Sequence, residues 1–124
     1  MAGDFHNTLK HLINEYILLG YQTSKKFPKD EQYGMTSQAR RALLSIMLNY
    51  VEGYGRTKKK VTLNQYEISF GSLKESIYVF YLAQHLSIIS KEEYLKLFQL
   101  KERIAQMLWK TIEGIKKDIN DPDE

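Results

Sequence analysis

The chain has 124 residues, 43% of them hydrophobic, which suffices for one packed domain over residues 1–124 and argues against a disordered protein. It contains no cysteine, which excludes disulfides, thiolate metal sites and cysteine nucleophiles and fits a reducing cytoplasm. No apolar run is long enough to cross a membrane and the first residues are polar, so neither a membrane span nor a secretory signal is expected.

The net charge of +3 is unevenly distributed along the chain. Residues 25–60 hold nine basic and three acidic residues, whereas the rest of the chain holds nine basic and twelve acidic residues. A polyanionic partner such as RNA is one explanation of this asymmetry, and a solvated face that aids solubility is the other.

Apolar residues recur at steps of three and four over four stretches, which is the spacing of helices that bury one face. The first helix is expected over residues 5–26 and ends before Pro28, because the residue preceding a proline avoids helical angles. The second is expected over residues 36–54, with Thr36 or Ser37 as its N-cap.

Two capping boxes mark the remaining helices. Thr62, followed three residues later by a glutamine, predicts a third helix over residues 62–87. Ser90, followed three residues later by a glutamate, predicts a fourth over residues 90–119. Four helices with short connections predict an all-α fold, an antiparallel up-down-up-down four-helix bundle.

A glycine-rich, basic stretch follows the second helix. Gly53 and Gly55 are expected to end that helix, because glycine adopts the left-handed cap conformation easily. The segment lacks the spacing of a phosphate loop and follows a helix instead of a strand, but exposed backbone donors beside cations still suit phosphate. The candidate nucleic-acid-binding residues are Arg40, Arg41, Arg56, Lys58, Lys59 and Lys60.

Arg40 and Arg41 are adjacent, so their side chains point about 100° apart on a helix. The guanidinium group suits phosphate and carboxylate alike. One arginine can therefore form a salt bridge with Glu52 or Glu75, within the subunit or across a subunit boundary, while the other faces outward.

The third helix carries a second apolar stripe besides its core stripe, which indicates an interface. Most of the nine tyrosines fall on helical stripes, where packing explains them, whereas Tyr33 and Tyr54 lie beside glycines and are better candidates for exposed contacts. The predicted oligomer interface consists of Glu52, Glu75, Tyr78, Tyr81 and Leu82.

No catalytic signature is present in the sequence. The three histidines lack the zinc-binding spacings, and no glutamate is followed by a histidine at the spacing that di-metal bundles use. The sequence therefore predicts no catalytic residue, no metal site, no cofactor and no enzyme.

Three segments, FPKDEQYGMTSQARRALLSI, NYVEGYGR and YEISFGSLKES, resemble the family of 23S ribosomal RNA intervening-sequence proteins over essentially the whole chain. That family is related to the accessory variability determinant proteins of diversity-generating retroelements. The chain departs from the family pattern where Met47 and Leu48 replace a proline and a small residue, and where Tyr50 and Val51 replace isoleucine and alanine. The matched positions are Phe27, Pro28, Glu31, Tyr33, Gly34, Thr36, Ser37, Gln38, Arg40, Arg41, Asn49, Glu52, Gly53, Gly55, Arg56, Gly71, Ser72 and Glu75.

The resemblance implies a homo-oligomeric ring, a homopentamer in the related proteins, that binds RNA or DNA with low specificity and assists a reverse transcriptase. Two hypotheses remain open. In the first, the protein is a non-enzymatic, cytoplasmic nucleic-acid-binding accessory protein. In the second, it is a structural oligomer that binds a protein partner through the tyrosine-rich surface of the third helix.

Overall fold

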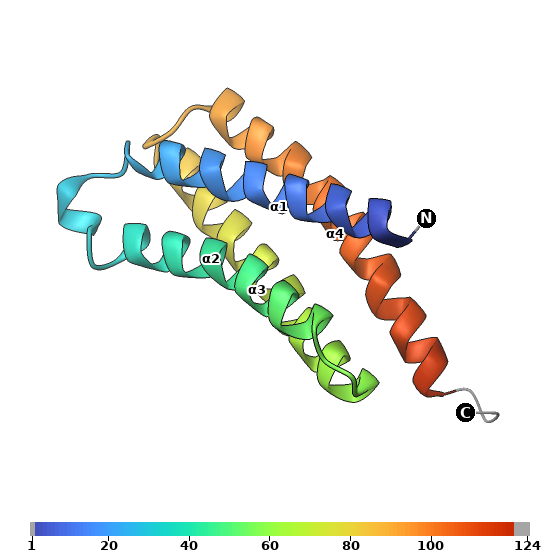
Figure 1. Cartoon of the computed structure of the whole chain (residues 1–124). Helices are drawn as coiled ribbons and strands as arrows, with labels where there is room; N and C mark the ends of the chain where they lie inside the picture. Colours follow the sequence, from blue (N-terminus) through green and yellow to red (C-terminus); the bar gives the residue numbers. More distant parts are fainter. Residues whose placement is uncertain (1, 121–124) are drawn as a thin grey trace.

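The computed structural model describes residues 2–120, and that part of the chain contains four long helices, one short 3-10 helix and no strand. Each long helix packs against the two that neighbour it in the ring α1–α2–α3–α4, whereas diagonal pairs lie farther apart (Figure 1). The predicted four-helix bundle is thereby confirmed for the described residues. The elements are α1 (Ala2–Ser24), η1 (Lys29–Glu31), α2 (Met35–Tyr54), α3 (Lys59–His85) and α4 (Lys91–Ile119).

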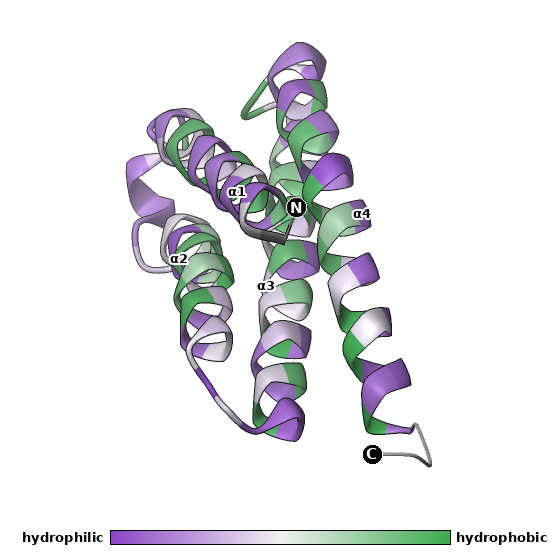
Figure 2. Cartoon of the chain, turned by 45° about the vertical axis from the view of Figure 1, so that its right-hand side comes forward, coloured by the Kyte–Doolittle hydropathy of each residue, from purple (hydrophilic) through white to green (hydrophobic). Residues whose placement is uncertain are grey.

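The apolar faces of the helices turn inward and polar residues lie outward (Figure 2). One hydrogen-bonded group crosses this core. The Ser76 hydroxyl donates to the Leu73 carbonyl at 2.8 Å, so the Tyr16 hydroxyl, also 2.8 Å away, donates to Ser76. Tyr16 on α1 and Ser76 on α3 are both completely buried, so this bond satisfies the Tyr16 hydroxyl, which would otherwise be unpaired in the core.

Helices α2 and α3 approach each other closely because small residues line their contact. The Ser45 and Ser72 hydroxyl oxygens are 2.7 Å apart, and Ser69 donates to the Ile46 carbonyl at 2.7 Å. At Gly53 a Cβ atom would lie only 2.8 Å from Cε1 of the buried Tyr66 ring. A glycine is therefore required there by the close approach of the two helices.

Of the two glycines predicted to end α2, Gly55 is confirmed as its C-cap, whereas Gly53 and the predicted left-handed conformation are wrong. Gly53 lies inside the helix, and Gly55 is the C-cap with a right-handed φ of −86°. None of the described glycines has a positive φ. The helix ends instead where the Arg56 N–H turns back to the Gly53 carbonyl at 3.2 Å.

Two predicted N-caps are also wrong. α2 begins at Met35 after Gly34, and its first N–H donates to the Glu31 carboxylate at 3.0 Å, so Thr36 and Ser37 do not cap it. α3 begins at Lys59, three residues before Thr62, whose hydroxyl donates to the Gly53 carbonyl at 3.0 Å. At α2 the Glu31 carboxylate takes the place of the expected cap, whereas α3 extends three residues farther and its N-cap, Lys58, makes no capping side-chain hydrogen bond.

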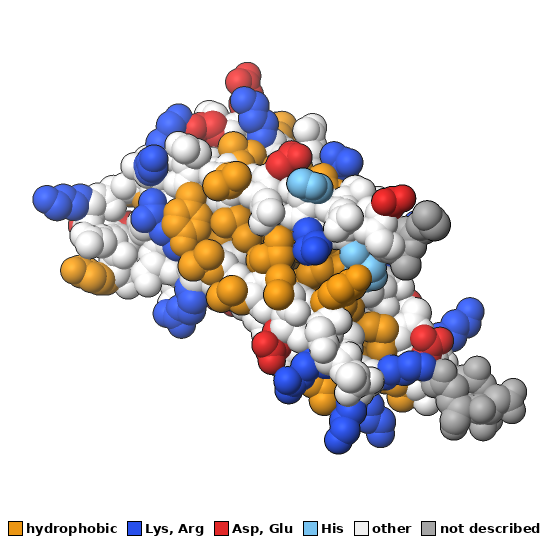
Figure 3. Space-filling model, in the orientation of Figure 1, with side chains coloured by type: hydrophobic (Ala, Val, Ile, Leu, Met, Phe, Trp, Pro, Cys, Tyr) orange, Lys and Arg blue, Asp and Glu red, His pale blue; other side chains and the backbone are white. Residues whose placement is uncertain are grey.

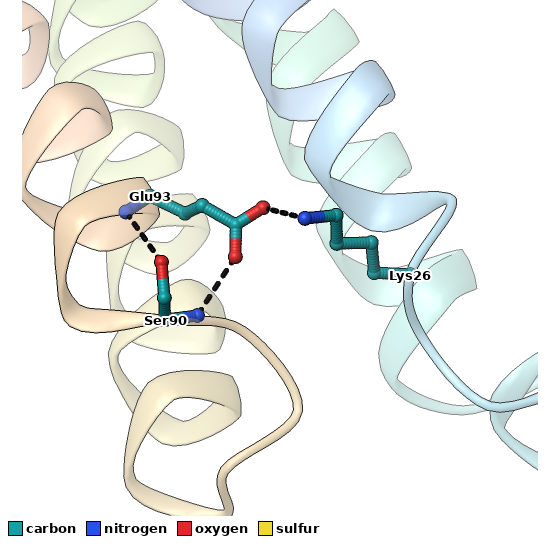
Figure 4. A network of polar contacts seen from close by, with 3 residues as sticks. All are labelled: Lys26, Ser90 and Glu93. Atoms are coloured by element: carbon teal, nitrogen blue, oxygen red, sulfur yellow. Dashed lines mark hydrogen bonds and ion pairs between the residues drawn. The ribbon is translucent and has the colours of Figure 1, made fainter.

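The capping box of α4 is confirmed (Figure 4). The Glu93 N–H donates to Ser90 Oγ at 3.1 Å, and the Ser90 N–H donates to Glu93 Oε1 at 2.8 Å. Lys26, just beyond α1, forms an ion pair with the other carboxylate oxygen of Glu93. The hydrogen bond from Lys26, followed by that from Ser90, lowers the pKa of Glu93.

Candidate nucleic-acid interface

The six predicted nucleic-acid-binding residues occupy three separate places in the structure. Arg40 is half-buried between α1 and α2, where its Nε–H donates to the Ser24 hydroxyl at 3.0 Å. Its guanidinium lies 5.0 Å from the centre of the Tyr21 ring. These contacts support a packing role for Arg40, and it forms no salt bridge with Glu52 or Glu75 within the chain.

Arg41 is exposed on the outer face of α2 and forms no ion pair with any residue of the described range. It precedes Arg56 by fifteen residues, or about 22 Å along a helix. Arg41 is therefore too far from the end of α2 to belong to one compact site with the remaining four residues.

Those four residues lie together at residues 55–60, the connection between α2 and α3 with the first two residues of α3, here called the basic connector. The Arg56 guanidinium is 3.6 Å from the Glu52 carboxylate, and the Lys59 ammonium is 3.9 Å from Asp118 of α4. Both pairs are well exposed. A surface hollow of about 400 Å³ is lined by Gly55, Arg56, Thr57, Lys58 and Val61.

The three lysines of the basic connector stand at the positive end of a helix dipole. Lys58 is the N-cap of α3 and has no capping side-chain hydrogen bond, and the first turn contains no acidic residue. A cation near a helix N-terminus is unfavourable by about 0.3–1 kcal/mol. Lys58, Lys59 and Lys60 therefore reduce helix stability, and together with the backbone N–H groups of the first turn they create a strongly positive surface.

An aromatic cluster supports the end of α2 just before the connector. Tyr50 hydrogen-bonds to His6 Nδ1 and stacks on Tyr66 with ring centres 5.0 Å apart. Burial, together with the nearby Tyr54, raises the pKa of Tyr66 to about 12. Burial, and then the charge of Lys10, lowers the pKa of His6. Tyr54 packs edge-on against His6 and is 53% exposed, so the prediction that its ring is accessible is confirmed.

A second group of cations was not predicted from the sequence. Lys96, Arg103, Lys110 and Lys117 stand seven residues apart on α4, all are exposed, and none forms an ion pair with another described residue. We call these four residues the α4 row. A helix-wheel projection would have found them, but they are invisible to a search for dense charge along the chain.

The predicted interface residues are largely exposed. Tyr78 is 60% exposed, and Tyr81 and Leu82 are each 40% exposed, although Tyr81 also packs on His85 and on Tyr94 of α4. Glu75 is exposed, and Glu52 is engaged by Arg56 of the same chain.

The sequence did not predict a further apolar band over α1 and α2, which Figure 3 shows as a broad hydrophobic surface between the two helices. Its exposed members include Leu18, Leu44, Leu48 and Val51. Val51, where the chain departs from the family pattern, has a side chain that is 53% exposed.

The described residues provide no group of three or more histidine, cysteine or acidic side chains that could hold a metal ion. None of the helices in residues 2–120 combines the length and the apolar character needed to cross a membrane.

A family model described as 23S rRNA-intervening sequence protein matches residues 12–110. Among solved structures, the chain is similar to a protein of unknown function from the S23 ribosomal protein family of Bacteroides thetaiotaomicron. The two share 20% sequence identity with a TM-score of 0.77, over 84% of this chain and 97% of the other. At that identity the likeness establishes the fold only. No curated protein matches the chain.

Proposed function

The chain belongs to the family of 23S rRNA-intervening sequence proteins, and on this premise we propose that it is a non-enzymatic, homo-oligomeric protein that binds RNA or DNA through the basic connector. The observation that carries the proposal is the placement of Lys58, Lys59 and Lys60 at the N-terminus of α3. Three lysines there oppose the helix dipole and have no compensating acid in that turn. A phosphate group would be bound by the same ammonium and backbone N–H groups.

The neighbouring residues fit contact with nucleic acid. Arg56 lies next to the three lysines, and its pairing with Glu52 at 3.6 Å is exposed and therefore weak. Tyr54 presents an accessible ring two residues before Arg56, on which a base can stack. Binding of this kind depends on phosphate and is expected to have low sequence specificity.

The exposed apolar surfaces support assembly. One lies on α3 at Tyr78, Leu82 and Leu86, and the other is the band over α1 and α2. Two different surfaces on one subunit suit a heterologous interface, and such interfaces close into rings when the rotation between subunits allows it. A ring of five, which the resemblance implies, would place five basic connectors in one particle and raise the apparent affinity for a long nucleic acid.

A salt titration tests nucleic-acid binding. Structured RNA should bind at low salt, and the affinity should fall steeply and linearly with the logarithm of salt concentration. Replacing Arg56, Lys58 and Lys60 with glutamine should weaken binding at least tenfold. Undetectable RNA and DNA binding at low salt, or unchanged binding by this variant, would contradict the proposal.

Light scattering tests the assembly. The unmodified chain should have the mass of an oligomer, and Leu82→Glu should dissociate it, whereas Glu75→Gln on the same helix should not. If the variant that lacks Arg56, Lys58 and Lys60 binds a cellular protein partner normally while Tyr78→Ala does not, the protein-interaction hypothesis replaces nucleic-acid binding. The reverse-transcriptase partner follows from the resemblance alone and is tested by co-purification.

A further inference from the structure

The α4 row has a regular geometry. Successive members are seven residues apart, so they are spaced by about 10.5 Å along the helix and the whole row spans about 32 Å. A seven-residue step on a straight helix drifts by only about 20°, so the four cations form a nearly straight line on one side of α4.

That side of α4 faces the seam with α1. Lys96 lines a hollow of about 280 Å³ together with Leu19 and Gln22 of α1. Lys110 and Lys117 line another hollow of about 480 Å³ together with Phe5 and His6 of α1. Arg103 lies between these two ends by helical periodicity. The row therefore follows the α1–α4 seam over most of its length.

Nearby acids within the described range form no ion pair with the row. Glu93 is paired with Lys26, Asp118 with Lys59 and Glu113 with Lys116. The exposed acids of α1, Asp4 and Glu15, form no ion pair with the row.

Helix stability does not explain the row either. Lys117 in the last turns suits the negative end of the α4 dipole, but Lys96, Arg103 and Lys110 lie too far from that end to benefit.

The row has few stacking platforms, because Phe5 and His6, the aromatic residues in the hollow beside Lys110 and Lys117, are half-buried and pack edge-on against each other. Between its members the exposed side chains include Gln99 and Gln106, and the exposed aromatic residue of α4, Trp109, packs toward α3 on Phe70. Proteins that bind single strands combine cations with aromatic rings, whereas a duplex is held mainly through its phosphates. Cations in a rigid line with few accessible rings therefore favour a double helix.

We propose that the α4 row is a second phosphate-binding surface, which holds double-helical nucleic acid along the α1–α4 seam as an extension of the basic connector. The inference rests on the proposed function. Asp118 pairs with Lys59 of the connector, so the Lys117 end of the row adjoins the connector and one duplex can contact both. A span of about 32 Å corresponds to about nine base pairs at 3.4 Å each, so shorter duplexes cannot reach all four cations.

The test measures binding of the full chain to duplexes of 8, 16 and 24 base pairs and to a 16-nucleotide single strand, by fluorescence anisotropy over a range of salt. The row variant is compared with a control variant that removes four exposed lysines elsewhere. Thermal unfolding by circular dichroism checks that both variants fold. The row variant carries Lys96→Gln, Arg103→Gln, Lys110→Gln and Lys117→Gln, and the control carries Lys25→Gln, Lys29→Gln, Lys74→Gln and Lys91→Gln.

The unmodified chain should gain affinity between 8 and 16 base pairs and should prefer the 16-base-pair duplex to the single strand. The row variant should lose at least tenfold in affinity for that duplex and most of the gain with length. Its slope of log affinity against log salt should fall by about 3 to 4, because each lost phosphate contact removes about 0.9. The control variant should stay within about threefold of the unmodified chain.

Three results would overturn the inference: a row variant that binds like the control, a preference for the single strand, or equal competition by polyglutamate, which would indicate an acidic protein partner. Failure of the proposed function is distinguishable, because the unmodified chain would then bind none of the nucleic acids at low salt.

Discussion

The basic connector and the α4 row each hold four cations, but they hold them differently. The connector gathers Arg56 and three lysines within five residues at the start of a helix, where two of the four have acidic partners. The row spreads its cations over 22 residues of one continuous helix, and none is paired within the described range. Dense charge in the sequence is thus a poor measure of how much charge is available on the surface.

The two regions also differ in what they require of the fold. The connector exists because α2 and α3 meet closely at Gly53 and Tyr66, and its lysines oppose the α3 dipole. The row requires only that α4 form and pack on α1. Substitutions that alter the packing of α2 on α3 should therefore affect the structure of the connector, and substitutions within α4 should affect the row.

Gly53→Ala should have the largest effect on stability. The added Cβ would lie 2.8 Å from the buried Tyr66 ring, so the ring must move, and overpacking of this kind costs about 1–3 kcal/mol. Gly114→Ala, in the row region, adds a methyl group to open space and should stabilise α4 by about 0.5–1 kcal/mol. Urea unfolding measures both changes, and equal effects would remove the distinction between the two regions.

Ser90→Ala should destabilise the protein by about 1 kcal/mol, because it removes the acceptor for the Glu93 N–H at the start of α4. Ser90→Asp retains an acceptor and is the matched control. The row variant should lower RNA affinity, whereas Ser90→Ala should lower the urea midpoint of unfolding. An unchanged midpoint in Ser90→Ala would contradict the capping role.

Lys58→Ser should separate stability from binding in the connector. Serine at the extended N-cap of α3 provides the missing acceptor and should add about 0.5–1 kcal/mol, while one lost phosphate contact should lower the salt slope by about 1. Lys96→Ser in the row should lower the slope similarly without stabilising the fold. If Lys58→Ser failed to raise the urea midpoint, the idea that Lys58 lowers the stability of α3 while it contributes to binding would be refuted.

The pH dependence of stability should give the smallest effect and concerns His6, which lies between the two regions. Its pKa is below the ordinary 6.5 because of burial and of Lys10, so the unfolded chain binds the proton more readily. Stability is therefore full above pH 6.5 and declines as the pH falls through the lowered folded-state pKa. The urea midpoint between pH 7.5 and 5.5 should fall less in His6→Gln than in His11→Gln, the exposed histidine control.

The sequence predicted the four helices well because each buries one face with a clear period. It failed at helix ends that depend on tertiary partners. Thr62 binds the Gly53 carbonyl instead of capping α3, and Glu31 supplies the cap of α2 from outside it. The sequence also left Arg40 and Arg41 equivalent, because only the packing of α1 on α2 places Arg40 against Tyr21 and Ser24.

The candidate site was predicted only where charge is contiguous. The connector follows from five neighbouring residues, but the row depends on the helical turn and on which side of α4 meets α1. The position of α1 is fixed by the fold as a whole and cannot be read from the α4 sequence.

The hydrogen bond between Tyr16 and Ser76 fixes the position of α1 along α3. If α1 slid by one turn, about 5.4 Å, the Tyr16 hydroxyl would be buried without a partner, at about 1–3 kcal/mol. A core of apolar side chains alone would tolerate such sliding, but the loss of this hydrogen bond makes it unfavourable. Because α1 is fixed in this way against α3, the distance between the α4 row and the basic connector stays constant. A rigid duplex with regularly spaced phosphates can therefore contact both surfaces at once.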